Sequence, residues 1–190
     1  MTVLSLMTLV SNASKQVVSS FLYYARAVDP TILMALSDIA TQQAAPIENP
    51  RKCVKQFLDY MWTHPNAKIC YRASNMILND HSNTSYLSAP PARSRAGGYI
   101  LLGSLPVDGN PIKLNSAIQI TCTILKLVAA SAAEAELGAL FLNAQEAKVL
   151  CLTLNKLGHP QPQTPIHINN TTTVGIVNNT IKQQCYHAMK

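Results

Sequence analysis

Charged residues are scarce in this sequence. Only 13% of its 190 residues are charged, whereas 48% are hydrophobic. Disordered chains show the opposite combination, because a chain with little apolar surface and much charge cannot form a core. The composition therefore excludes a largely disordered protein. It predicts one full domain, or a small domain with an additional helical arm.

Closely spaced cysteines are absent as well. The five cysteines are an odd number at wide intervals, and none of the five histidines lies at a metal-ligand spacing from them. This pattern excludes a disulfide framework and the paired ligands of a structural zinc site. We expect reduced, mostly buried thiols and no bound zinc. The cysteines are Cys53, Cys70, Cys122, Cys151 and Cys185.

The apolar start of the chain lacks the features of a signal peptide or an anchor. The segment MTVLSLMTLV has no basic region before it and is too short to span a bilayer. We therefore expect no signal peptide, no membrane partner and a cytoplasmic or nuclear location.

Acidic residues are outnumbered by basic ones. Fifteen Lys and Arg against nine Asp and Glu give a formal net charge of +6. This balance permits a phosphate-rich partner. The basic residues are scattered, with no run longer than Arg51-Lys52, so a solvated basic surface explains them equally well.

The first third of the chain has helical periodicity. Apolar residues recur at intervals of three and four over residues 16–44 and again over residues 54–61. Asp29-Pro30 is typical of an N-cap followed by a first turn, so it predicts a division of the first segment into two helices. We expect residues 1–66 to form a helical arm.

From residue 67 onward, short apolar runs alternate with Asn, Ser, Gly and Pro, which is typical of strands and turns. An alanine-rich segment predicts a helix over residues 129–157, with Asn143 as a candidate break and Gly158 as its cap. Together the elements predict an α/β fold in which a mixed sheet, with residues 76–86 central, is flanked by helices. Strands are expected at residues 69–71, 76–86, 98–102, 113–124 and 164–168, a hairpin loop at 106–110 and a last helix at 172–178.

Four blocks of the sequence resemble a known family in the right order over residues 16–189. They are FLYYARAVDP (21–30), similar to "LLYLARATRPD"; SYLS with ARSRAGGY (85–99), similar to a first hairpin; SAAEAELGAL (131–140), similar to "SSTEAEYMAL"; and IHINN (166–170), similar to "IYCDN". The chain therefore resembles the ribonuclease H region, with its preceding connection segment, of a copia-type long-terminal-repeat retrotransposon polyprotein.

The resemblance implies a division of the chain. Residues 1–66 would be the helical connection segment that follows the reverse transcriptase, and residues 67–190 a ribonuclease H-like domain. The family's final strand and helix fall beyond Lys190, so we expect this domain to be C-terminally truncated.

The family's chemistry needs a cluster of carboxylates. A ribonuclease H cuts the RNA strand of an RNA–DNA hybrid by attack of water on phosphorus, assisted by two Mg²⁺ ions that about four carboxylates hold. An amide keeps the shape of a carboxylate but lacks its charge, so it is a poor replacement as a Mg²⁺ ligand.

By this resemblance, the catalytic positions are Asn83, Glu136 and Asn169. Asn83 stands where the family's "SDASYLS" has Asp, and Asn169 stands where "CDN" has Asp. A Glu followed by an apolar residue, a small residue and Ala favours Glu136 over Glu134 as the helix carboxylate. Only Glu136 remains as a metal ligand, so no cofactor is expected, and Mg²⁺ would be the ion if the chain were active.

No neighbouring acid replaces the missing carboxylates. Asp80 lies three residues from Asn83, and an odd offset on a strand points to the opposite face. Asp108 falls in a predicted hairpin loop. Glu134 is about 200° around the helix from Glu136, so both cannot face one metal.

Three basic residues are candidates for binding nucleic acid. Arg93 and Arg95 lie in the predicted first hairpin, and Lys113 at the start of the predicted third strand, where phosphates of a hybrid need only positive charge. Long basic side chains also protect sheet edges from aggregation, and this explanation stays equally open.

Three functions follow from these features. The first is a degenerate, catalytically inactive ribonuclease H-like domain derived from a retrotransposon polyprotein, which Asn83 and Asn169 favour. The second is a structural module that binds an RNA–DNA hybrid, other nucleic acid or a reverse transcriptase domain. The third is an active magnesium-dependent ribonuclease H. The Tyr-X-Asp-Asp signature of reverse transcriptases is absent from the sequence, which excludes polymerase activity for this chain.

Overall fold

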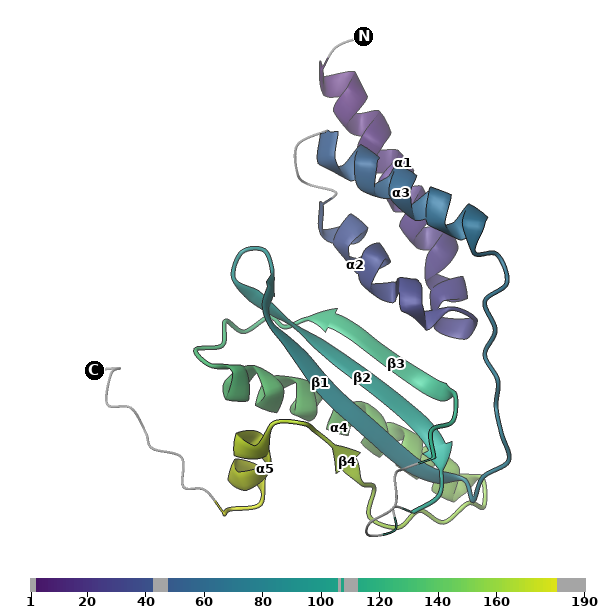
Figure 1. The fold of residues 1–190 in the computed structure, drawn as a ribbon, viewed down its shortest axis with the longest axis vertical. Helices are drawn as coiled ribbons and strands as arrows, with labels where there is room; N and C mark the ends of the chain where they lie inside the picture. The colour runs from purple at the N-terminus through teal and green to yellow at the C-terminus, as the bar shows by residue number, and fades with distance from the viewer. Residues whose placement is uncertain (1–2, 43–47, 106, 108–112, 181–190) are drawn as a thin grey trace, which may run out of the picture. The chain divides into compact units, whose positions relative to one another are not determined.

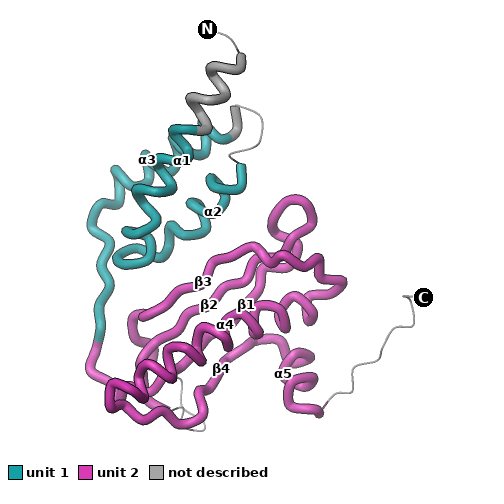
Figure 2. Tube along the Cα trace, turned by 180° about the vertical axis from the view of Figure 1, so that it is seen from behind, with its two compact units in different colours: residues 1–71 teal, residues 72–190 magenta. Residues whose placement is uncertain are grey.

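A computed structural model describes residues 3–42, 48–105, 107 and 113–180, with the backbone alone described at 3–11 and 48–49. The chain forms two compact units, Met1–Tyr71 and Arg72–Lys190 (Figure 2).

The first unit is helical. Asp29 caps the short helix η1, since its Oδ1 accepts a hydrogen bond from the Thr31 backbone N–H at 3.1 Å and Pro30 occupies the first turn. The predicted division at Asp29-Pro30 is thereby confirmed. Phe21 and Phe57 pack edge to face, with ring centroids 5.1 Å apart. The helices are α1 (Val3–Ala27), η1 (Pro30–Ile32), α2 (Leu33–Thr41) and α3 (Glu48–Thr63).

The second unit is a four-stranded mixed sheet flanked by helices, which confirms the predicted α/β fold (Figure 1). The strand order is β3-β2-β1-β4, with β1 antiparallel to β2, β2 antiparallel to β3 and β4 parallel to β1. This arrangement is consistent with a ribonuclease H-like fold. The elements are β1 (Ile77–Ala89), β2 (Arg93–Gly103), β3 (Ala117–Ile124), α4 (Ala132–Lys156), β4 (Ile166–His167) and α5 (Thr171–Val177).

Helix α4 lies across one face of the sheet (Figure 1). Leu78 and Ile100 pack against Ala147, and Ala96 packs with Ala135 in a second cluster nearer the start of the helix. Small residues on α4 let its backbone approach the strands closely. By length and composition α4 is also apolar enough to cross a membrane, a criterion that the core helix of a sheet protein meets equally.

Asn143 docks α4 on the sheet, so the predicted break at this residue is wrong. Helix α4 is continuous through Asn143, whose side chain is fully buried. Its Nδ2 donates hydrogen bonds to Ser82 Oγ and to the Gly97 carbonyl, both at 2.9 Å. The polar residue is tolerated in the helix because the strands satisfy its donors.

Several predicted boundaries also differ. Residues 69–71 form no strand, and the side chain of Asn115 instead bonds the backbone of Arg72, which follows them. The second strand begins at Arg93 rather than at residue 98, because the hairpin continues its pairing with β1 to Ala89. The third begins at Ala117 rather than 113. The predicted loop at 106–110, with Asp108, falls largely outside the described residues.

The contact between Asn143 and Gly98 gives a stability prediction. A Cβ atom on Gly98 would lie 2.7 Å from Asn143 Cγ, too close for a buried side chain whose partners hold it in place. We expect Gly98→Ala to lower the free energy of unfolding by about 1–3 kcal/mol in chemical denaturation.

The adjacent glycine supplies the control. A Cβ on Gly97 would meet only the Asn83 carbonyl oxygen, at 3.6 Å, so Gly97→Ala should cost less than about 1 kcal/mol. Equal losses for the two variants would show that Asn143 does not limit the approach of α4.

Candidate functional site

The candidate site lies at the edge of β1, just past the end of β4. Strand β4 pairs with β1 only at Asp80 and His81. Beyond His81, side chains form hydrogen bonds with the backbone of β1 on this edge. The Thr84 backbone N–H donates to Asn83 Oδ1 at 2.8 Å and to Glu136 Oε1 at 3.2 Å. Because two acceptors share one N–H, the Asn83 amide and the Glu136 carboxylate lie close together, although Glu136 is 52 residues beyond Thr84 in sequence.

The start of α4 positions Glu136. Ser131 is the N-cap, and its Oγ accepts a hydrogen bond from the Glu134 backbone N–H at 3.2 Å. The Glu134 carboxylate returns to accept from the Ala130 N–H at 2.8 Å, which completes a capping arrangement. Glu134 is therefore a helix-capping residue. Glu136 lies on the buried side of the same helix.

Glu136 is a buried carboxylate with incomplete hydrogen bonding. Its side chain is 5% exposed, and Oε2 is buried without a hydrogen-bond partner within the described residues. Burial raises the pKa of this carboxyl, while the hydrogen bonds from Thr84 lower it. The hydrogen bonds from Thr84 thus stabilise the ionised form of Glu136, which burial disfavours.

Asn169 follows β4 by two residues. His167 pairs with His81 in the parallel ladder, which ends at this pair, and no hydrogen bond joins Asn169 to Asn83 or Glu136 in the described part of the chain. Both amide side chains are exposed. The next residue, Asn170, caps α5 by accepting from the Thr173 N–H at 3.1 Å, so Asn169 is held between a strand and a capped helix.

Asp80 points away from Asn83, to the face covered by α4. Leu78 and Ser82, at even offsets on the same strand, both contact α4. Asp80 is 0% exposed, and neither carboxylate oxygen has a hydrogen-bond partner in the described ranges. Burial raises its pKa from 3.8 to about 6. No pattern in the sequence indicates this burial, since Asp is rarely enclosed without a partner.

His81 and His167 form a pair that linear spacing did not reveal. Their rings stack with centroids 4.8 Å apart and an interplanar angle of 28°. Burial lowers the pKa of both imidazoles, and the charge of His167 lowers that of His81 further. The signal that would find them is the strand register, because the two residues are directly opposed only when β4 pairs with β1.

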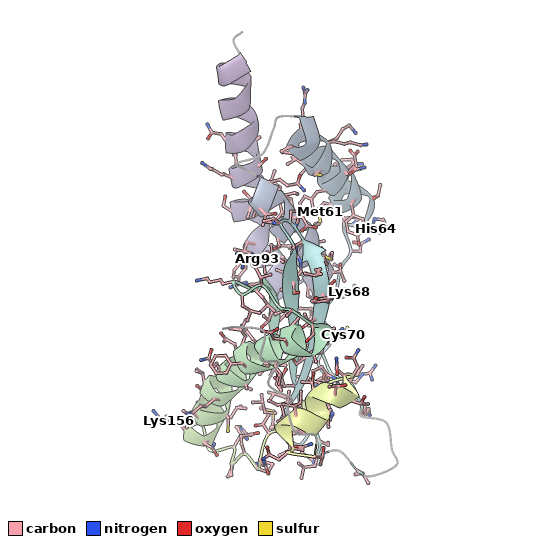
Figure 3. The ribbon with its side chains drawn as sticks, turned by 90° about the vertical axis from the view of Figure 1, so that its left-hand side faces the viewer. Met61, His64, Lys68, Cys70, Arg93 and Lys156 are labelled. Carbon is pink, nitrogen blue, oxygen red and sulfur yellow. The ribbon has the colours of Figure 1, made fainter. Side chains whose placement is uncertain are left out.

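The three candidate basic residues do not share one surface. Arg95 is 6% exposed, and its Nη1 lies 3.9 Å from Cys122 Sγ. Arg93 begins β2 beside the hairpin, as Figure 3 shows, far from Lys156 at the end of α4. Lys113 does not begin β3 but precedes it, next to Gly103 at the other end of β2.

Comparisons with known proteins add no relative. No protein-family model matches the sequence, and neither a curated protein nor a solved structure does so. Within the described residues, no group of three or more His, Cys, Asp or Glu side chains is arranged to hold a metal ion.

The buried Asp80 predicts a dependence of stability on pH. A carboxyl whose pKa is higher in the folded state favours folding at low pH, and this contribution is lost as the pH rises through about 6. A shift of two pKa units corresponds to about 3 kcal/mol. Asp80→Asn should therefore be more stable than the unchanged chain at pH 8 by up to about 3 kcal/mol, and close to it below pH 4.

Denaturation curves of the two proteins at several pH values measure this difference. Asp59→Asn is the control, since Asp59 is exposed and pairs with Lys55. That variant should change the free energy of unfolding by less than about 1 kcal/mol. A constant difference between Asp80→Asn and the unchanged chain from pH 4 to pH 8 would contradict the prediction.

Proposed function

We propose that the second unit is a degenerate ribonuclease H-like domain, derived from a retrotransposon polyprotein, that does not cleave RNA–DNA hybrids. The observation that carries the proposal is the meeting of Asn83 and Glu136 at the Thr84 amide. Sequence resemblance selected these two residues as former catalytic positions, without reference to any distance between them. Their convergence supports the resemblance.

The topology gives a second line of support. The strand that carries Asn83 is interior, and the strand that leads to Asn169 is its parallel neighbour. Helix α4, which carries Glu136, connects the antiparallel strands to β4. The first strand, the helix and the end of the fourth strand are the three elements on which the family carries its acidic residues, and this arrangement supports the resemblance.

The charge at this edge argues against cleavage. Two Mg²⁺ ions held within ~4 Å repel each other strongly and need several carboxylates to offset the repulsion. Asn83 and Asn169 contribute no charge, and one Glu136 oxygen is occupied by the Thr84 N–H. Asp80 does not take the place of Asn83, because its side chain leaves the opposite face of β1 and is fully buried.

A nucleic-acid-binding module without catalysis receives less support. Such a surface needs several cations on one face to contact successive phosphates. Arg95 is largely buried, and Lys113 lies at the opposite end of β2 from Arg93.

Hybrid cleavage tests the proposal. The purified chain should leave an RNA–DNA hybrid intact in millimolar Mg²⁺ or Mn²⁺, and Glu136→Gln should behave identically. Magnesium-dependent cutting that Glu136→Gln abolishes would overturn the proposal and show an active nuclease.

Restoring the carboxylates tests the residue assignment. Asn83→Asp with Asn169→Asp should strengthen Mg²⁺ binding by about tenfold or more, measured by titration calorimetry, because three carboxylates then face one edge. Asn155→Asp is the control, since it adds one of the two negative charges near the C-terminal end of α4, away from Glu136. Equal gains from both proteins would mean that Asn83 and Asn169 are not the former metal positions.

A further inference from the structure

We propose that His81 and His167 form a binding site for a divalent transition-metal ion of the zinc class. The site uses other residues than Asn83, Glu136 and Asn169, and it stands whether or not the chain cleaves a hybrid. It arises from two adjacent strands that each contribute one imidazole to the same face of the sheet.

The strand register aligns the two histidines. His81 on β1 and His167 on β4 are direct partners in the parallel ladder, so their side chains leave the same face of the sheet side by side. The ring centroids lie 4.8 Å apart, close to the spacing of neighbouring strands. The pair is therefore held by backbone pairing and does not depend on a flexible loop.

One ring nitrogen of each histidine lacks a hydrogen-bond partner. Nε2 of His81 and Nε2 of His167 are both buried and have no hydrogen-bond partner in the part of the chain that the structure describes. A buried polar atom without a partner is costly, and native proteins usually satisfy such atoms. A metal ion satisfies two imidazole nitrogens at once, because each donates its lone pair to the ion.

Chelation requires the two rings to leave their stacked arrangement, because each Nε2 lone pair lies in its ring plane and the planes are only 28° apart. Two nitrogens bound to one tetrahedral zinc at about 2.0–2.1 Å lie about 3.3 Å apart. The rings must therefore lean together at their Nε2 ends by about 1.5 Å relative to the centroid spacing. Rotation of the imidazoles about χ2, a soft torsion, provides a shift of this size.

The surrounding residues decide which ion fits. On β1 the histidine is followed two residues later by Asn83 on the same face. His167 is followed two residues later by Asn169, beyond the end of β4. These side chains offer neutral amides rather than carboxylates. Imidazole suits zinc, copper and nickel, whereas Mg²⁺ prefers anionic oxygen ligands. The pair should therefore select a transition metal over Mg²⁺, with water completing the coordination.

Titration of the complete chain with Zn²⁺ tests the site. Calorimetry should show one ion bound per chain. His81→Gln and His167→Gln should each weaken binding by about tenfold or more, since each removes one of two protein ligands. His64→Gln and His159→Gln are the matched controls, because both residues are exposed, and they should leave the affinity within about twofold.

A thiol control is also needed, because thiolates bind zinc. Cys122 lies on β3, two strands from His81 and on the same face by register. Cys122→Ser should leave the affinity within about twofold. A loss of binding in Cys122→Ser that exceeds the loss in both histidine variants would overturn the proposal in favour of a thiolate site.

A measurement on the unchanged chain covers the case in which a histidine variant fails to fold. Imidazole ¹⁵N resonances followed by NMR should show that Zn²⁺ shifts Nε2 of His81 and His167, and that Mg²⁺ at the same concentration does not. Shifts confined to other histidines, or no histidine shift at saturating Zn²⁺, would refute the site.

Discussion

The parallel pairing of β4 with β1 is the interaction on which the rest of the second unit depends. The ladder is only two residue pairs long, and other hydrogen bonds extend it. The Asp80 N–H donates to the Pro165 carbonyl at 3.1 Å. Gln161 Oε1 accepts from the Leu78 N–H and its Nε2 donates to the Met76 carbonyl, both at 2.9 Å. One glutamine side chain thereby replaces the backbone of a strand residue, so a very short strand is held in a fixed register.

This register determines which polar side chains meet. It aligns His167 with His81 and directs the chain past Asn169 to the cap of α5. Thr173 Oγ1 then donates to the Ala133 carbonyl at 3.3 Å, which ties α5 to the first turn of α4. Neutral amides and imidazoles thus occupy the edge at which a metal-dependent nuclease would concentrate negative charge. The same backbone geometry is compatible with either set of side chains, since none of these residues is needed to fill the core.

Local signals predicted the elements better than their contacts. Asp29-Pro30 encodes a helix start in two adjacent residues, so the division of the first helical segment was readable from the sequence. Asn143 was misread as a break because its hydrogen-bond partners lie on two strands far away in the chain. The family resemblance alone suggested that Glu136 lies near Asn83, and it did not indicate the hydrogen bond to Thr84. The pairing of His81 with His167 depends on a strand register that a two-residue strand does not reveal in the sequence. Long-range pairing, unlike capping, leaves no local pattern to read.

The short β4 has a consequence for self-association. In the described part of the chain it covers only two of the thirteen residues of β1 on that edge, and an uncovered edge is a template for pairing with another strand. Asn83 and Glu136 accept hydrogen bonds from the Thr84 N–H, which is then not free to bond to an incoming strand. The side chains of Asn83 and Glu136 therefore oppose edge-to-edge pairing of this sheet with another strand.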